Sequence, residues 1–269
     1  MSDADLARRI TLIAADTWPA IEAWDYDGWV LRFARGYTKR ANSITPLAPG
    51  ELPLASKIEA CEAAYEARHI PPVFCLPSIV DIGTLDDVLA ARGYGKIDKT
   101  SIRAMALTDA LPAAGTGLEI SPVLTAAWLD PVAAWNGLDR RQRAAFAAIA
   151  GGIREPAAFA LLRSGAAPVA AGIAVRQQDL VCFHAVITAP EARRRGFARV
   201  LMVELLRWAR AAGATTAWLQ VVKSNAPALR LYNELGFDRE ICRYHYRTRS
   251  GDAVSLSSAG TSPTRPPSP

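Results

Sequence analysis

The sequence contains few of the residues that build metal sites and disulfide frameworks. It has only four cysteines and three histidines in 269 residues. The cysteines are far apart, no CxxC pair occurs, and the histidines do not stand at zinc-ligand spacing. We therefore expect reduced, mostly buried thiols and no metal. The cysteines are Cys61, Cys75, Cys182 and Cys242.

Long apolar runs are also missing, although about half of the residues are hydrophobic. No stretch reaches the roughly 20 consecutive apolar residues that span a bilayer, which argues against a membrane protein. The apolar content is high enough for a core and excludes a mostly disordered chain. The segment Met1–Asp5 is acidic where a secretory signal would be basic, so we expect a cytoplasmic protein.

Lysine is scarce, and arginine supplies most of the positive charge behind the net charge of +5. Together with the abundant alanine, this bias indicates a GC-rich bacterial genome. Five surplus charges on a chain of this length are too diffuse to indicate nucleic-acid binding. They suit an anionic small ligand if they are concentrated in one place. The lysines are Lys39, Lys57, Lys96, Lys99 and Lys223.

A segment rich in proline, glycine and small residues at 108–117 predicts a linker between two domains. Before it, Ser56 and Glu59 have the spacing of a capping box at the start of a helix. The expected helices of this first half are 6–18, 56–69 and 85–91, and its expected strands are 29–33, 73–76 and 100–107.

The second half predicts a mixed α/β sheet rather than a simple βαβ repeat. After residue 249, serine, glycine, proline and threonine dominate and predict a disordered tail at 250–269. The expected helices are 124–138, 140–150, 197–212 and 227–235, and the expected strands are 158–163, 168–176, 180–188, 216–222 and 237–247.

The most informative segment is 186–202, where a strand leads through a basic turn into a helix. The first N–H groups of a helix have no internal partner, and the helix dipole is positive at this end. Gly196 lets a ligand approach the backbone, and four arginines surround it. These features predict a pyrophosphate site, with a solvated basic turn as the alternative. The Walker pattern GxxxxGK[ST] and the dinucleotide pattern GxGxxG are absent. The arginines are Arg193, Arg194, Arg195 and Arg199.

A second segment, 220–237, leads from a strand into another helix. Asn225 is placed to cap this helix, and Pro227 stands in its first turn. Read alone, Asn225 is a plain cap and Tyr232 is a core aromatic at helical spacing.

Together the two segments resemble the GNAT superfamily of acyl-CoA-dependent N-acyltransferases. Arg193-x-x-Gly196-x-Ala198 matches the family's [RQ]-x-x-G-x-[GA] motif. The resemblance covers about residues 118–249 and implies a mixed, mostly antiparallel α/β sheet flanked by helices. It also implies transfer of an acetyl group from acetyl-CoA to a primary amine, with no metal. The second signature matches Asn225, Ala228, Tyr232, Gly236 and Phe237 at the family spacing.

The resemblance also implies roles for single residues. Tyr232 would donate a proton to the leaving CoA thiolate, which a phenol can do because its ordinary pKa is near 10. The other matching positions would bind the cofactor through the pantetheine arm or the pyrophosphate. These cofactor positions are Val186, Thr188, Arg193, Arg194, Arg195, Gly196, Phe197, Ala198, Arg199 and Asn225.

The general base is less defined. Strand alternation predicts that Cys182, His184 and Val186 share one face. A histidine there could take the proton of the substrate amine, directly or through water. The alternatives are a buried core histidine and a mechanism in which water alone accepts the proton.

The first half, 1–107, resembles a degenerate GNAT-like domain, so the chain resembles a tandem arrangement with a catalytic domain at 118–249. Leu89–Tyr94 repeats the order helix, glycine, aromatic, strand that occurs at Tyr232–Phe237. No [RQ]xxGx[GA] motif precedes residue 108, and Val88 or Leu89 stands where Tyr232 would match. This half could shape the acceptor pocket through Arg40–Ser43, for which an ordinary turn is the favoured alternative.

Three functions compete at this stage. The first is an N-acetyltransferase that acts on a small-molecule or peptide amine, without nucleic-acid or membrane partners. The second is a sensor that binds acyl-CoA without turnover. The third is a nucleic-acid binder, which the lack of interleaved aromatic residues disfavours. The identity of the acceptor and the oligomeric state stay open, with a homodimer as one option.

Overall fold

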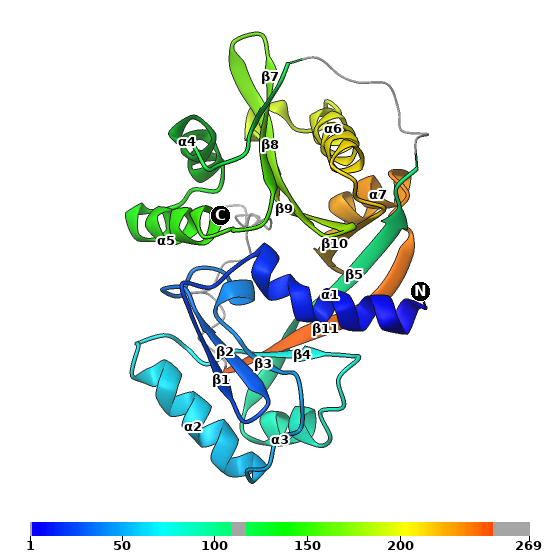
Figure 1. Ribbon diagram of the computed structural model, residues 1–269. Coiled ribbons are helices and arrows are strands. Elements are labelled where there is room, and N and C mark those ends of the chain that lie inside the picture. Colours follow the sequence, from blue (N-terminus) through cyan, green and yellow to red (C-terminus); the bar gives the residue numbers. More distant parts are fainter. Residues whose placement is uncertain (1, 109–116, 250–269) are drawn as a thin grey trace, which may run out of the picture.

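The computed structural model describes residues 2–108 and 117–249 (Figure 1). Most of the expected linker and the whole expected tail lie outside the described residues. The helices are α1 (Asp3–Thr17), α2 (Leu54–Glu66), α3 (Leu85–Ala91), α4 (Ala126–Trp135), α5 (Arg140–Gly151), α6 (Phe197–Ala211) and α7 (Ala226–Glu234). The short 3₁₀ turns are η1 (Lys39–Ala41) and η2 (Pro190–Ala192). The strands are β1 (Glu22–Tyr26), β2 (Trp29–Phe33), β3 (Ile44–Pro46), β4 (Phe74–Pro77), β5 (Tyr94–Ala106), β6 (Leu118–Ser121), β7 (Ala157–Ser164), β8 (Ala167–Gln177), β9 (Leu180–Thr188), β10 (Thr216–Val222) and β11 (Arg239–Arg249).

All of these strands belong to one 11-stranded sheet with the order β1-β2-β3-β4-β11-β5-β10-β9-β8-β7-β6. Neighbouring strands are antiparallel except at two junctions, β3 with β4 and β9 with β10. The structure thus confirms the predicted mixed, mostly antiparallel α/β sheet.

The two halves of the chain exchange strands at the centre of the sheet. The last strand of the second half, β11, lies between β4 and β5 of the first half. In turn, β5 lies between β10 and β11. Each half therefore completes its sheet with a strand from the other, a connection that no local sequence pattern predicts.

Helices cover both faces of the sheet (Figure 1). On one face, α6 and α7 pack over the second half, and α2 and α3 pack over the first. On the other face, α1 crosses the central strands while α4 and α5 cover β7 and β8. The end of α1 brings Trp18 into the same core cluster as Phe146 of α5. A residue of the first half therefore reaches the core of the second.

The predicted start of α2 is wrong. The helix begins at Leu54 after Pro53, with no side-chain cap, so Ser56 does not act as its N-cap. A tertiary contact holds the chain before the helix instead of a local cap. The carboxylate of Asp27 accepts hydrogen bonds from the backbone N–H groups of Glu51 and Leu52.

Candidate active site

A pocket opens where the parallel strands β9 and β10 separate. The two strands pair only along Leu180–Cys182 and Thr216–Trp218. Beyond these residues, β9 continues along β8 and β10 continues along β5. The opening holds a cavity of about 130 Å³. Four predicted site residues line it, namely His184, Val186, Asn225 and Tyr232.

A β-bulge shapes the β9 side of this pocket. The register with β8 jumps between Ala171 and Ile173, and Ala185 has a φ of 49°, which is unusual for a residue other than glycine. The bulge breaks strand alternation. The prediction that His184 and Val186 share a face with Cys182 is therefore wrong for Val186, which packs in the core cluster under α6.

The turn before α6 has the form of an anion-binding nest. Gly196, the residue preceding the helix, has a left-handed φ of 82°, and no side chain caps the helix there. Arg194 also has a positive φ of 62°. Such a turn followed by a helix start directs unpaired N–H groups outward. Thr188 ends β9 on the approach to this turn, and Phe197 and Ala198 begin the helix.

The arginines of this turn lie at the surface rather than in the pocket. The side chains of Arg193, Arg194 and Arg199 are exposed. Arg195 is also exposed, and its guanidinium lies 5.1 Å from the centre of the Phe197 ring. Their charge surrounds the start of the helix, where the dipole also favours an anion.

Tyr232 and Asn225 reach the pocket from α7. Tyr232 packs edge-on against Phe237 and against the core cluster under α6. Burial raises the pKa of Tyr232 to about 12, so the phenol stays protonated at neutral pH. Asn225 caps α7 by accepting a hydrogen bond from the backbone N–H of Ala228 at 3.2 Å. Asn225 is thus both a helix cap and a pocket residue.

His184 is enclosed on the other side of the pocket. Its side chain is only 2% exposed and stacks on Trp18 at a ring distance of 5.0 Å. Neither ring nitrogen has a hydrogen-bond partner within the described part of the chain. Burial lowers the pKa of His184, and the nearby cations Arg40 and Arg32 lower it further. The imidazole is therefore neutral at pH 7.

The first half of the chain forms a wall of the same pocket. Its lining includes Trp18, Lys39, Arg40 and Asp98. Of the loop Arg40–Ser43, which the sequence suggested as part of the acceptor pocket, Arg40 lines the pocket. Neither the motifs nor the helical periodicity predicted Trp18, Lys39 and Asp98 as wall residues. They reach the pocket from the turn after α1, the turn after β2 and the exchanged strand β5.

The loop that carries Lys39 and Arg40 is held from behind by buried Asn42. Its side-chain amide donates to the carbonyls of Tyr37 and Thr38, at 2.6 and 2.9 Å. Its carbonyl oxygen accepts from two more backbone N–H groups of the same loop. Thr38 adopts a φ of 59°, a strained conformation for a β-branched residue. The loop is therefore a fixed part of the site.

Two further observations bear on the class of protein. In residues 2–108 and 117–249, no group of three or more His, Cys, Asp or Glu side chains could hold a metal ion. Within the same residues, every helix is too short or too polar to cross a bilayer.

Comparisons with known proteins agree with this geometry. The family model described as "Probable histone acetyltransferase Rv0428c C-terminal" matches residues 5–249. The uncharacterized N-acetyltransferase YobR of Bacillus subtilis is 26% identical over 249 residues, which cover 91% of this chain and 99% of YobR. The GCN5-related N-acetyltransferase from Kribbella flavida has the same fold, with a TM-score of 0.67 at 19% identity, covering 94% of this chain and 99% of that one.

A shorter match is local. The ribosomal protein bS18-alanine N-acetyltransferase of Salmonella typhimurium is 40% identical over 70 residues, 25% of this chain and 47% of that enzyme. The chain thus spans about half the length of this relative. Since the family model spans nearly all of the described chain, the protein belongs to this acetyltransferase family and is an N-acetyltransferase of the GNAT type.

Proposed function

We propose that the protein transfers the acetyl group of acetyl-CoA directly to a primary amine in the pocket between β9 and β10. One observation supports this proposal: β9 and β10 separate at a cavity lined by Tyr232, and the nest before α6 follows the end of β9. No covalent intermediate on the enzyme is required.

Acetyl-CoA would bind along this path. The backbone of β9 between Val186 and Thr188 would pair with the pantetheine arm, because β10 does not occupy that edge beyond Cys182. The N–H groups of 194–198 would bind the pyrophosphate, assisted by the surrounding arginines; the N–H of Arg199 donates to the carbonyl of Gly196 at 3.0 Å. Asn225 would lie beside the pantetheine.

The chemical step would use two proton transfers. The amine nitrogen attacks the thioester carbonyl carbon, a C–N bond forms, and the C–S bond breaks. Tyr232 gives its proton to the departing sulfur, a role that suits a phenol kept protonated by burial. A water molecule beside His184, or the imidazole itself, takes the proton from the amine, and the lowered pKa of the imidazole favours the water.

The first half would be a degenerate copy of the second. Both halves contain one parallel strand junction, β3 with β4 and β9 with β10, at corresponding places on either side of the shared strands β5 and β11. In this proposal 1–107 and 118–249 remain the two domains, and only the second binds acetyl-CoA. The first supplies the acceptor wall.

Release of CoA thiol tests the proposal. The full chain is mixed with acetyl-CoA and a panel of primary amines, and free thiol is followed with a chromogenic disulfide. We expect amine-dependent thiol release with at least one acceptor. Binding of acetyl-CoA without release on any amine would favour the sensor alternative.

A further inference from the structure

The acceptor side of the pocket contains buried polar atoms that the fold leaves unpaired. Within the described residues, three side chains that line it have such atoms: Trp18 (Nε1), Arg40 (Nε) and His184 (Nδ1 and Nε2). Buried polar groups in proteins are almost always hydrogen-bonded, so a concentration of unpaired ones needs an explanation. A bound ligand is the simplest one, because all three residues line one cavity.

The unpaired atoms are mainly donors. An indole nitrogen and a guanidinium nitrogen can only donate, whereas a neutral imidazole has one donor and one acceptor. The group that satisfies them must therefore supply acceptor oxygens. The hydroxyl of Tyr244 contacts Arg40, but no carboxylate of the described residues lies within ion-pair distance of this guanidinium.

The charge of the pocket leads to the same class of ligand. Its charged lining residues are Lys39, Arg40 and Asp98, and Asp98 is already paired with Lys39 at 3.0 Å. Arg32 adds a second buried guanidinium behind the loop, where it donates to the carbonyls of Ala15 and Arg40. A purely cationic acceptor would face this unbalanced positive charge in a poorly solvated site.

We infer that the acceptor is an amine with a carboxylate close to its amino group, in the manner of an α-amino acid, and that Arg40 binds this carboxylate. The inference rests on the proposed acetyl transfer and adds its substrate class. An ion pair between a guanidinium and a carboxylate fixes orientation as well as charge. It would hold the amino group toward the thioester.

The test compares acids with matched amides. CoA thiol release is measured with glycine, L-leucine and L-phenylalanine, and with glycinamide, L-leucinamide and L-phenylalaninamide. Spermidine and a lysine peptide with blocked termini serve as cationic acceptors. The amides contain the less basic amine and more of its free form at a given pH, so amine protonation cannot produce a preference for the acids. We expect kcat/KM for an acid to exceed that for its amide by about 10- to 100-fold.

Substitutions of Arg40 test whether this residue causes the preference for acids over amides. Arg40→Gln should bring the acid-to-amide ratio close to one, and Arg40→Lys should restore part of it, since charge is kept but the planar fork is lost. A merely structural role would lower both rates and leave the ratio unchanged. Arg8→Gln removes a charge from an exposed position on α1 and should leave the ratio at its wild-type value.

Failure of the inferred acceptor class and failure of the proposed acetyl transfer give different results. A wild-type ratio near one, faster turnover of spermidine or the lysine peptide, or an unchanged ratio in Arg40→Gln would overturn the inference and leave acetyl transfer standing. Absence of thiol release with every amine would overturn the proposed function. Calorimetry of L-leucine with the CoA-loaded protein would then decide the Arg40 site: binding lost in Arg40→Gln would support it, and no binding to the wild type would overturn it.

Discussion

The turns that lead into α2 and α6 differ in what lies beside a glycine of left-handed backbone conformation. Each contains a glycine with positive φ, Gly50 at 78° and Gly196 at 82°. At α6 the space around the glycine is open, and a Cβ added to Gly196 would meet no atom within 4 Å. At α2 a Cβ on Gly50 would lie 2.2 Å from a carboxylate oxygen of Asp27. The protein's own carboxylate thus occupies the place where an outside anion would bind.

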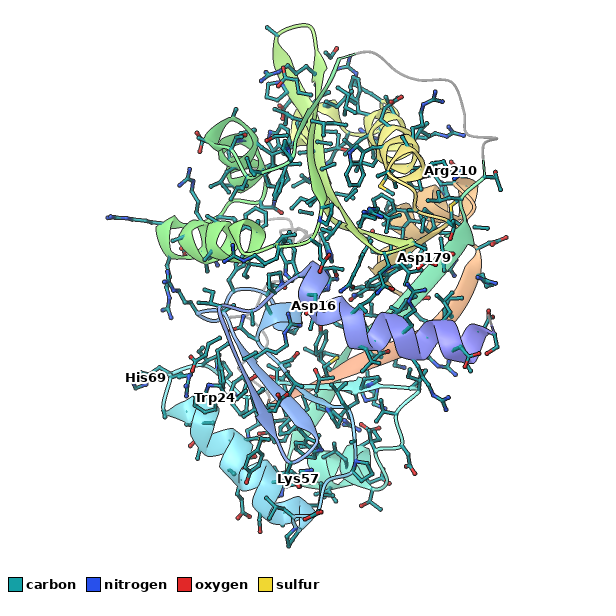
Figure 2. All side chains as sticks on the ribbon, in the orientation of Figure 1. Asp16, Trp24, Lys57, His69, Asp179 and Arg210 are labelled. Atoms are coloured by element: carbon teal, nitrogen blue, oxygen red, sulfur yellow. The ribbon has the colours of Figure 1, made fainter. Side chains whose placement is uncertain are left out.

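Lysine completes this internal anion site. Lys57 is 1% exposed, pairs with Asp27 at 3.0 Å, and lies 4.4 Å from the centre of the Trp29 ring. Figure 2 shows Lys57 on α2 beside the β1–β2 hairpin. In the first half a carboxylate of the chain thus occupies the turn before α2, whereas the nest before α6 in the second half is open. The comparison indicates why only the second half would bind acetyl-CoA.

Gly196→Glu places a carboxylate in the open nest and should have the largest effect. The new charge would repel the pyrophosphate, and the backbone there disfavours a side chain. We expect acetyl-CoA binding, measured by calorimetry, to fall more than 100-fold, by roughly 3 kcal/mol.

Gly213→Glu is the matched control. Gly213 has a φ of 90°, lies in open space and follows the opposite end of α6. It adds the same strain and charge away from the nest. Equal loss of binding in both variants would contradict the pyrophosphate assignment.

Tyr232→Phe tests a second difference between the halves, since in the proposed tandem arrangement Val88 or Leu89, which have no proton to donate, would stand where Tyr232 does. Loss of the general acid should lower kcat by about 10²- to 10⁴-fold and leave acetyl-CoA affinity within a few-fold. Steady-state rates and calorimetry measure the two effects separately. Tyr26→Phe on β1 is the control, and an unchanged kcat for Tyr232→Phe would remove the general-acid role.

Asp27→Ala tests whether the first half contains a hidden cofactor site. It should lower Tm by several degrees, because Lys57 stays buried without its carboxylate, while the calorimetric stoichiometry stays at one acetyl-CoA per chain. Asp25→Ala, at an exposed position on β1 two residues before Asp27, should change neither. A stoichiometry of two would show that the internal carboxylate alone separates the halves.

The pKa of Asp27 fixes how the contribution of the Asp27–Lys57 pair to stability changes with pH. Hydrogen bonds from the N–H groups of Glu51 and Leu52, and the pair with Lys57, lower the pKa of Asp27 below its ordinary value of 3.8. Its contribution is therefore complete above that pH and is lost as the pH falls below it.

The buried imidazole of His184 should lower the free energy of unfolding at a less acidic pH than Asp27 does. Its pKa is lowered in the fold, so the unfolded chain binds a proton near pH 6.5 that the folded chain refuses. Stability is then complete above this pH and falls by about 1.4 kcal/mol for each unit below it, until the folded imidazole is protonated. Thermal unfolding at pH 6.5 and 5.5 measures this slope, and His184→Phe should flatten it. Equal slopes in both proteins would contradict the buried, neutral imidazole.

Much of the second half could be predicted from sequence because its signals are local. The strands β9 and β10 and the left-handed Gly196 follow from apolar runs and turn residues within a few positions. The short strands β1 and β6 were missed, since most of their residues are exposed and give no alternation. The bulge at Ala185 was missed as well, because nothing in the run of β9 marks an extra residue.

The acceptor wall could not be predicted because it depends on tertiary structure. Arg40 entered the hypothesis only as a loop residue, and Asp98 did not enter it. A second bulge places Asp98 beside Lys39, where the register of β5 with β11 shifts between Tyr244 and Tyr246. Sequence patterns report the faces of single elements, whereas this wall needs the order of strands in the whole sheet.

The exchange of β5 and β11 also sets an order of events during synthesis. Within the described residues β11 is the last strand to be synthesised. It pairs with β4, so that the backbone N–H of Arg243 donates to the hydroxyl of Ser78, 165 positions earlier in the sequence. Until the ribosome has released β11, one edge each of β4 and β5 has no partner. Pairings of this range are slow to form and leave strand edges open to aggregation. The strands of the first half therefore cannot complete their sheet until β11 has been synthesised.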